Sequence, residues 1–121
     1  MVLTNNEIYS LYEGLNKIVQ NKELKIPVKT SFYILKNIKE LQNAYESLMD
    51  LRKEIILKYA DQDGENYTIP AEKIEAANME LTDLLIIENE VNIAKIKLSD
   101  IESLEIDLED IGSIMMIIEE E

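Results

Sequence analysis

Residues 28–63 read VKTSFYILKNIKELQNAYESLMDLRKEIILKYADQD and contain neither Gly nor Pro. Apolar side chains recur in this stretch at alternating gaps of three and four, with Arg52 in the one skipped place: Ile34, Ile38, Leu41, Tyr45, Leu48, Ile55 and Tyr59. This spacing predicts one helix of about 30 residues with a heptad-like apolar seam. Such a seam needs a partner, which is either a later part of the chain or a second copy.

The segments on either side of this stretch predict two more helices. Thr4 and Glu7 have the spacing of a capping box, which marks the start of a first helix over about residues 5–21. Pro70 suits the first turn of a further helix that extends to about residue 89. Because a polar turn separates the long helix from this one, we expect the two to pack as an antiparallel hairpin.

The pattern changes after the third helix. β-Branched residues recur at a period close to two over residues 91–98, which predicts a strand. A lone strand is unstable, so we expect it to pair with the segment at 66–69 or with another chain. Farther on, Ser99 and Asp107 stand where they could cap two helical segments, and the second should extend to about Ile118.

These elements together predict a mainly α fold. A long antiparallel helical hairpin would pack with an N-terminal and a C-terminal helix, and a small β element would join 66–69 with 91–98. The chain has 121 residues with only three Gly and two Pro, and no linker divides it. We therefore expect a single domain over residues 1–121.

Composition removes several kinds of chemistry from this chain. It contains no Cys and no His, so thiol nucleophiles, thiolate metal ligands and the commonest general base are all absent. Catalysis by Ser-His-Asp or Cys-His groups and zinc sites are excluded on the same ground. We expect a protein that is not an enzyme and uses no cofactor.

Hydropathy and charge narrow the range of partners. No apolar run approaches the roughly 18 residues of a membrane span, and the N-terminus lacks the regions of a signal peptide, so we expect a cytoplasmic protein without membrane contact.

The net charge is −13. Residues 1–60 hold nine Lys and Arg against seven Asp and Glu, whereas residues 61–121 hold three against eighteen. This asymmetry discourages direct nucleic-acid binding and suits a basic protein partner or a cation.

The turn before the third helix resembles a calcium loop. Four acidic residues fall at places 1, 3, 5 and 12 of the EF-hand pattern: Asp61, Asp63, Glu65 and Glu72. Asn66 stands where that pattern requires Gly, and Pro70 stiffens the end of the loop. We therefore expect a solvated turn, with these four residues as the candidate ligands of a metal.

The C-terminal apolar run predicts a contact with another chain. Five adjacent apolar residues would cover a helix on every side, so both faces would need burial: Ile114, Met115, Met116, Ile117 and Ile118. Methionine suits adaptable surfaces. We expect part of this run to bind a protein partner or a second copy, together with the neighbouring carboxylates of Glu102, Glu105 and Glu109.

The dense carboxylates of the second half also suggest an alternative. Such a surface could imitate the phosphate rows of DNA and block a protein with a basic groove. Ile and Leu residues are interspersed among these carboxylates, which is typical of the polar side of amphipathic helices. Mimicry is therefore the second hypothesis and protein binding the first.

Three stretches carry a resemblance to a known family. They are LTNNEI at residues 3–8, LKIPVK at 24–29 and IAKIKLSDIE at 93–102. Over most of its length the chain resembles a family of short acidic proteins encoded by phages and prophages of Gram-positive bacteria. That family has no settled activity, so the resemblance implies a setting and no catalytic residues.

The resemblance and the composition lead to one expectation about function. We expect a non-catalytic phage-encoded protein that acts by protein–protein binding, in an assembly, minor structural or host-modulating role. It would be found in the host cytoplasm or assembled into a phage particle. The alternative is an acidic DNA mimic or anti-defence inhibitor of a protein with a basic groove.

Overall fold

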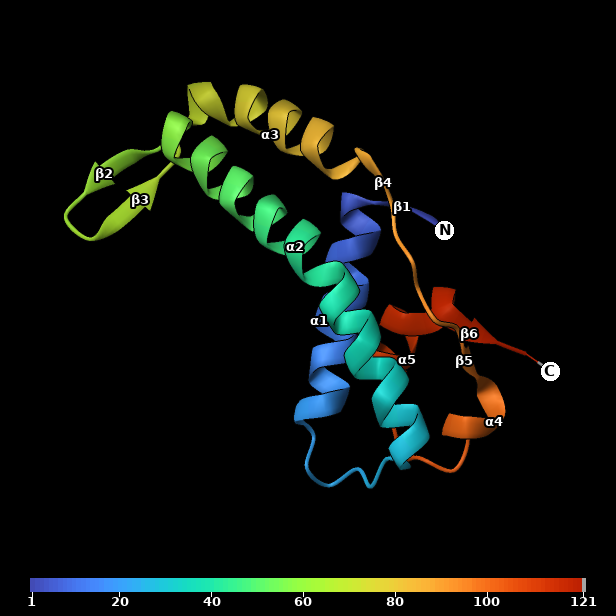
Figure 1. Ribbon diagram of the computed structural model, residues 1–121. Helices are drawn as coiled ribbons and strands as arrows, with labels where there is room; N and C mark the ends of the chain where they lie inside the picture. The colour runs from blue at the N-terminus through green and yellow to red at the C-terminus, as the bar shows by residue number, and fades with distance from the viewer. Residues whose placement is uncertain (121) are drawn as a thin grey trace.

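The computed structural model describes residues 1–120, apart from the side chain of Asp63. Its chain is mainly helical, as expected, and forms a body from which one long arm projects (Figure 1). The arm comprises residues 49–85, which are the second half of α2, a β-hairpin and α3. The body holds the two ends of the chain and almost all of the core.

The first helix begins where the sequence predicts. α1 spans Asn5–Gln20 and follows a short strand, β1, at Val2–Thr4. The Glu7 backbone N–H donates to Thr4 Oγ1 at 3.1 Å, and the Thr4 N–H donates to Glu7 Oε1 at 3.0 Å. The capping box is therefore present, and it satisfies two backbone donors at the start of the helix.

The helical hairpin is also confirmed. α2 spans Val28–Tyr59, and α3 spans Ala71–Leu85 and packs antiparallel to the second half of α2 (Figure 1). Within the seam, Ile34, Leu41 and Leu48 are buried. α3 ends earlier than expected, because the chain enters strand β4 at Glu88–Glu90.

The predicted strand pairing is wrong. Segment 66–69 does not meet 91–98: β3 (Asn66–Thr68) pairs antiparallel with β2 (Asp61–Asp63), across a turn in which Gly64 has φ of 65°. Gly adopts this conformation at no steric cost, so a local hairpin forms in place of a distant pairing. β4 instead pairs with β1.

Segment 91–98 forms only a two-residue strand. This strand, β5 at Ile96–Lys97, lies parallel to β6 at Ile118–Glu119. The Asn37 side chain, fully buried on α2, donates to the Ala94 carbonyl and accepts from the Ala94 N–H, both at 2.8 Å. A side chain of α2 thus takes the place of a partner strand.

The C-terminal elements are shorter than the sequence predicts. α4 spans Leu98–Ile101 and is preceded by Lys97 rather than capped by Ser99, and α5 spans Leu108–Ile114 after Asp107, whose side chain makes no cap bond. The expected helix to Ile118 is wrong. The chain tightens into a 3₁₀ turn, η1, at Met115–Ile117 and then enters β6.

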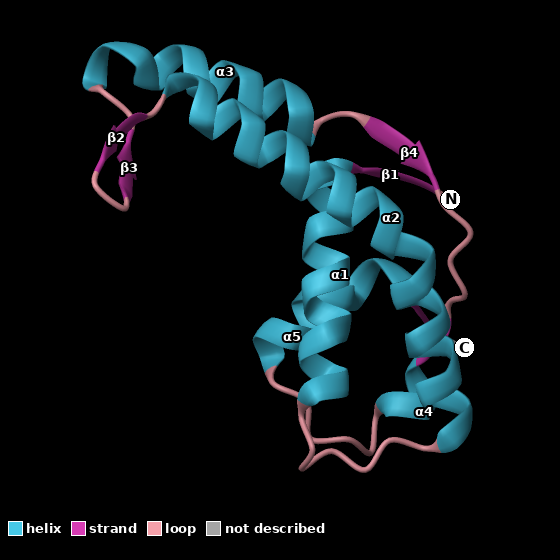
Figure 2. Cartoon of the chain, turned by 60° about the vertical axis from the view of Figure 1, so that its left-hand side comes forward, coloured by secondary structure: helices cyan, strands magenta, loops and turns pink. Residues whose placement is uncertain are grey.

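The body is built around α1, which lies between α2 and α5 (Figure 2). Four side chains of α1 are essentially inaccessible to solvent: Ile8, Leu11, Leu15 and Ile18. They pack with a ring of residues from the other elements, namely Ile34, Leu41, Ile96, Ile101, Ile114 and Ile117. This cluster is the hydrophobic core, and the arm adds little to it.

Replacement of Asn37 by Ala should strongly destabilise the body. The change leaves both backbone groups of Ala94 without their buried partner, so the free energy of unfolding should fall by about 2–4 kcal/mol in urea titrations. Glu40→Ala is the matched control, because the exposed Glu40 carboxylate binds the neighbouring Asn92 N–H at 2.9 Å. Equal losses for the two variants would contradict the role given to Asn37.

Replacement of Gly14 by Ala should separate α1 from α5. A Cβ at Gly14 would lie 2.6 Å from Ser113 Cβ and 3.1 Å from Ile114 Cγ2. We expect a loss of about 1–3 kcal/mol in the free energy of unfolding, despite the better helix propensity of Ala.

Two further variants test the cause of that loss. In a Ser113→Gly background the penalty of Gly14→Ala should shrink, because the clashing Cβ is gone. Gly112→Ala, on the same short helix, meets nothing within 4 Å and should be neutral or stabilising. A Gly14→Ala protein as stable as the wild type would show that the helices can move apart without cost.

Candidate functional site

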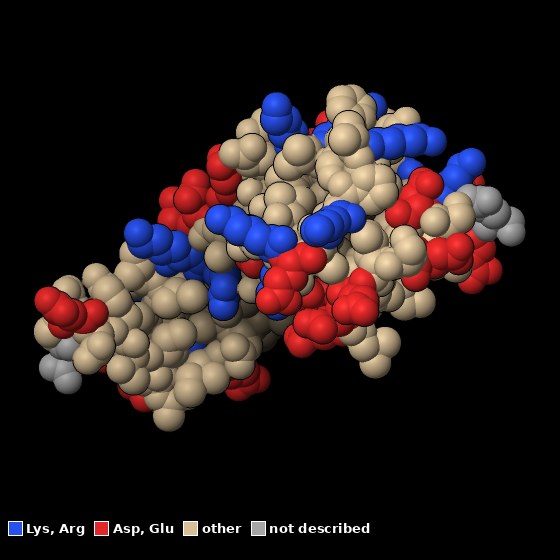
Figure 3. Space-filling model, turned by 90° about the horizontal axis from the view of Figure 1, so that it is seen from below, with Lys and Arg blue, Asp and Glu red and all other residues tan. Residues whose placement is uncertain are grey.

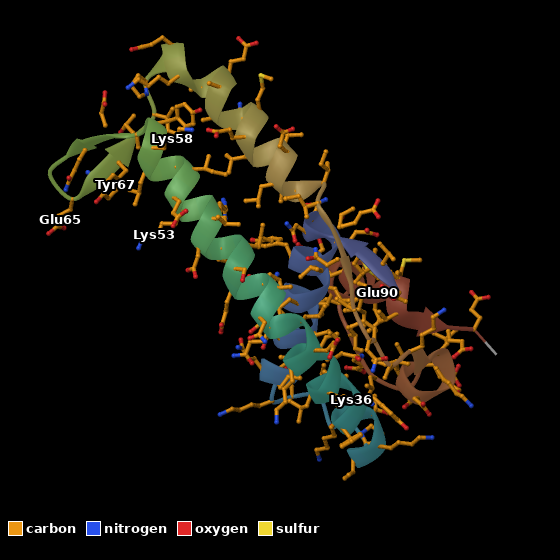
Figure 4. The ribbon with its side chains drawn as sticks, turned by 45° about the horizontal axis from the view of Figure 1, so that its top comes forward. Lys36, Lys53, Lys58, Glu65, Tyr67 and Glu90 are labelled. Atoms are coloured by element: carbon orange, nitrogen blue, oxygen red, sulfur yellow. The ribbon has the colours of Figure 1, made fainter. Side chains whose placement is uncertain are left out.

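The acidic turn folds as a β-hairpin and not as a calcium loop. Asp61 and Asp63 lie in β2, Glu65 occupies the turn at the tip of the arm, and Glu72 lies in the first turn of α3 (Figure 4). Asp61, Glu65 and Glu72 are exposed, and the side chain of Asp63 lies outside the described residues. Among the side chains that the structure describes, no three carboxylates gather as a metal site requires.

The C-terminal apolar run lies mostly inside the body. Ile114 and Ile117 are fully buried, Met116 and Ile118 are half-buried against the core, and Met115 is exposed. The chain leaves α-helical geometry after Ile114 and forms a 3₁₀ turn, and the two buried side chains, Ile114 and Ile117, are three residues apart. Ile114 and Ile117 therefore cannot contact a partner, whereas Met115 can.

The three carboxylates expected beside this run are at the surface. Glu102 and Glu105 are exposed around the loop between α4 and α5, and Glu109 is exposed in the first turn of α5. Met115 is therefore the member of the apolar run that shares the solvent-exposed surface with them.

The arm carries an apolar surface that the sequence reasoning did not single out. Only Ala77 and Leu84 are buried on α3, because its neighbours in the described part of the chain are α2 along one side and α1 at its C-terminal end. Several large apolar side chains of the arm are therefore exposed: Leu51, Leu57, Tyr67, Ile74 and Met79. Exposed apolar area of this kind is typical of an interaction surface.

Two hollows lie along one side of the arm and join at Met49 and Arg52. The inner hollow, of about 270 Å³, lies where the arm meets α1 and is lined by Asn6, Tyr9, Leu48, Met49, Arg52, Leu81, Leu84 and Leu85. The outer hollow, of about 290 Å³, is lined by Met49, Arg52, Lys53, Ile56, Leu57 and Tyr67. We call the two together the arm groove. It is mainly apolar, with two cationic side chains on its α2 side.

Figure 4 shows how side chains near the end of the groove lie. Tyr67 lies between the β-hairpin and α2, and Lys53 extends from α2 into solvent. This arrangement places an aromatic ring beside an apolar surface with a positive charge at its border. Aromatic side chains and Arg are enriched in protein interfaces, and Tyr67 and Arg52 both line the outer hollow.

A stack of tyrosines anchors the arm at its root. The Tyr45 ring of α2 stacks on Tyr12 of α1 with ring centroids 4.0 Å apart, and on Tyr9 at 6.0 Å. The Tyr45 hydroxyl donates to Glu13 Oε1. Burial, followed by this bond to a carboxylate, raises the pKa of Tyr45 to about 12.

Polar contacts hold the second half of α3 to α1 and to α2. Asn5, buried at the start of α1, donates from Nδ2 to the Leu84 carbonyl at 2.8 Å. Near the tip, Lys58 Nζ lies 3.0 Å from Glu80 Oε1. Hydrogen bonding to the Tyr59 hydroxyl, then to Lys58, holds the pKa of Glu80 below its usual value. This tie is present at neutral pH and is lost as the pH falls through that lowered pKa.

The Tyr45 phenol should titrate separately in alkali. Folding favours its neutral form, so this contribution to stability is complete below about pH 10 and is lost as the pH rises through about 12. The phenolate absorbance of the wild type, minus that of Tyr45→Phe, should therefore appear near pH 12 while the helical circular dichroism persists. A difference signal centred near pH 10 in the folded protein would contradict the buried bond to Glu13.

Comparisons with known proteins supply no family for this chain. No family model, no curated protein and no solved structure matches it. Among the described residues, none of the helices is both long and apolar enough to cross a membrane. The arm groove is thus identified from its geometry alone.

Proposed function

We propose that this chain is a non-catalytic protein that acts by binding another protein, with the arm groove as its binding surface. The observation that supports this most is the mainly apolar arm groove, which α2 and α3 leave open although they pack on each other. Apolar and aromatic anchors in a groove provide most of the affinity of typical interfaces.

The family resemblance gives the proposal its setting. We place the protein in a phage-infected host cell, as an assembly factor, a minor structural component of the particle or a modulator of a host protein. Each of these roles requires a docking surface and none requires bond-making chemistry. The arm groove, anchored to the body by Tyr45 and Asn5, is suited to that requirement.

The charge around the groove favours protein binding over imitation of DNA. Arg52 and Lys53 line the groove, and Lys58 lies near the end of α2. On the face shown in Figure 3, Lys and Arg side chains lie among Asp and Glu side chains. A DNA mimic needs continuous rows of negative charge like those of phosphates. The face shown in Figure 3 carries both positive and negative charges instead.

A double variant, Leu57→Asp with Tyr67→Asp, should abolish docking in the groove. Both side chains line the outer hollow and are exposed, so the new charges oppose an apolar partner without entering the core. The immobilised wild type and variant are each exposed to a lysate of the cells that make the protein. Retention of a partner should fall at least about tenfold in the variant.

Met79→Asp is the matched control for this experiment. It places the same charge on the same arm, in a hollow on the outer side of α3 that shares no residue with the groove. This variant should retain the partner, and raising the salt from about 0.1 to about 0.5 M should change retention little. Equal retention by all three proteins would contradict the proposal. A steep loss of retention with salt would also contradict it, and would favour an electrostatic contact.

A further inference from the structure

The first half of α2 carries a second exposed apolar surface, separate from the arm. Val28 is 87 % exposed and Phe32 is 61 % exposed, and Leu35 continues the same row. Their spacing of four and three residues places them on one side of the helix, opposite the buried Ile34 and Leu41. In the part of the chain that the structure describes, these three side chains remain open to solvent.

Positive charge borders this surface. Lys29, Lys36 and Lys39 are exposed and project from the same half of the helix, and residues 28–39 contain no carboxylate. Asp100 and Glu119 of other elements line one hollow together with Lys29, so Lys36 and Lys39 provide most of the positive border. Figure 4 labels Lys36 on this part of α2. We call the set Val28, Phe32, Leu35, Lys29, Lys36 and Lys39 the basic stripe. It would fit an apolar surface with a negative border.

The α5 helix presents such a surface. Leu108, the first residue of α5, is 87 % exposed, and Met115, which directly follows α5 in η1, is 66 % exposed. Between them Gly112 has open space where a Cβ would lie, so the helix surface is hollowed there by the missing side chain. Glu105 and Glu109 are exposed at its border. We call the set Glu105, Leu108, Glu109, Gly112 and Met115 the acidic face.

The two surfaces are complementary in charge as well as in apolar character. Residues 98–110 contain six Asp and Glu and no Lys or Arg, whereas residues 28–39 contain three Lys and no acid. Gly112 adds no side chain beside the exposed Leu108, so Phe32 of a second copy can approach the backbone of α5 there. Lys and Glu at the rim would then set the orientation of the contact.

One copy cannot close this contact on itself. α1 packs against both α2 and α5, and Figure 2 shows α5 on one side of α1 and the first half of α2 on the other. The exposed sides of α2 and α5 therefore point away from each other. We propose that the chain associates head to tail, with the basic stripe of one copy docked on the acidic face of the next.

Such a contact joins two different surfaces, so it differs from a symmetric dimer. Each copy keeps one free stripe and one free face, and addition continues until a ring closes or a filament forms. The contact uses no residue of the arm groove. Its failure would leave partner binding by the arm untouched, and the reverse also holds.

The mass of the full chain in solution provides the first test. Sedimentation from about 10 µM to about 1 mM should show species that grow past the dimer. Phe32→Asp blocks the stripe, and Leu108→Asp blocks the face. Both replaced side chains are exposed, so each variant should remain folded by circular dichroism and be monomeric alone.

A mixture of the two variants provides the decisive test. The intact face of Phe32→Asp can still bind the intact stripe of Leu108→Asp, so an equal mixture should form dimers and nothing larger. A symmetric interface gives no such rescue. Lys36→Glu with Lys39→Glu should weaken association at least about tenfold, and adding Glu105→Lys with Glu109→Lys in the same chain should restore it.

The double variant Leu57→Asp with Tyr67→Asp is the control, and it should associate as the wild type does, because it alters the arm alone. If Leu108→Asp is unfolded, Met115→Asp replaces it, since it blocks the same face. A wild type that stays monomeric throughout, or a mixture of blocked variants that stays monomeric while the wild type associates, would overturn the proposal.

Discussion

The burial of α1 between α2 and α5 is the contact on which the remaining structure depends. Ile8, Leu11, Leu15 and Ile18 lose essentially all exposure to water, and each such burial is worth about 1.5–3 kcal/mol before the entropy of folding is counted. Gly14, on the side of α1 that meets α5, allows the backbone of one helix to approach the side chains of the other. The capping box at Thr4 sets where this central helix begins, and thereby which of its residues face the core.

The arm projects from the body because α1 packs along only the first half of α2. α2 is about twice as long as α1, so its second half extends past the body and finds only α3 as a partner. Two packed helices can bury only the side chains that lie between them. On α3 these are few, because only Ala77 and Leu84 are buried. A segment with so few buried contacts belongs to the less stable part of a fold. Docking of a partner would therefore stabilise the arm as well as use it.

Local patterns in the sequence predicted the helices well and the strands poorly. The capping box, the seam of α2 and the proline before α3 are each set by neighbours within a few turns, so they can be read without the fold. The pairing of β5 with β6 and the bonds from Asn37 to Ala94 depend on which distant segments meet, which no local pattern contains. The expected helix to Ile118 does not form, because the chain passes from α5 through η1 into β6, which pairs with the distant β5. The open groove beside Leu57 likewise results from the shortness of α1, and not from any motif in the arm.

Part of the charge asymmetry along the chain persists between two surfaces of the body, although Lys29 lies beside Asp100 and Glu119, and Lys25 beside Glu105. The basic stripe and the acidic face lie on opposite sides of α1, so folding does not neutralise them against each other. Such a charge dipole attracts a second copy at close range, whereas the net charge of −13 repels it at longer range. Salt screens the long-range repulsion first, since the screening length is about 8 Å at physiological ionic strength and pairs in direct contact are screened less. A chain with this arrangement stays monomeric at low salt and low protein concentration. It associates when the salt concentration or the protein concentration rises.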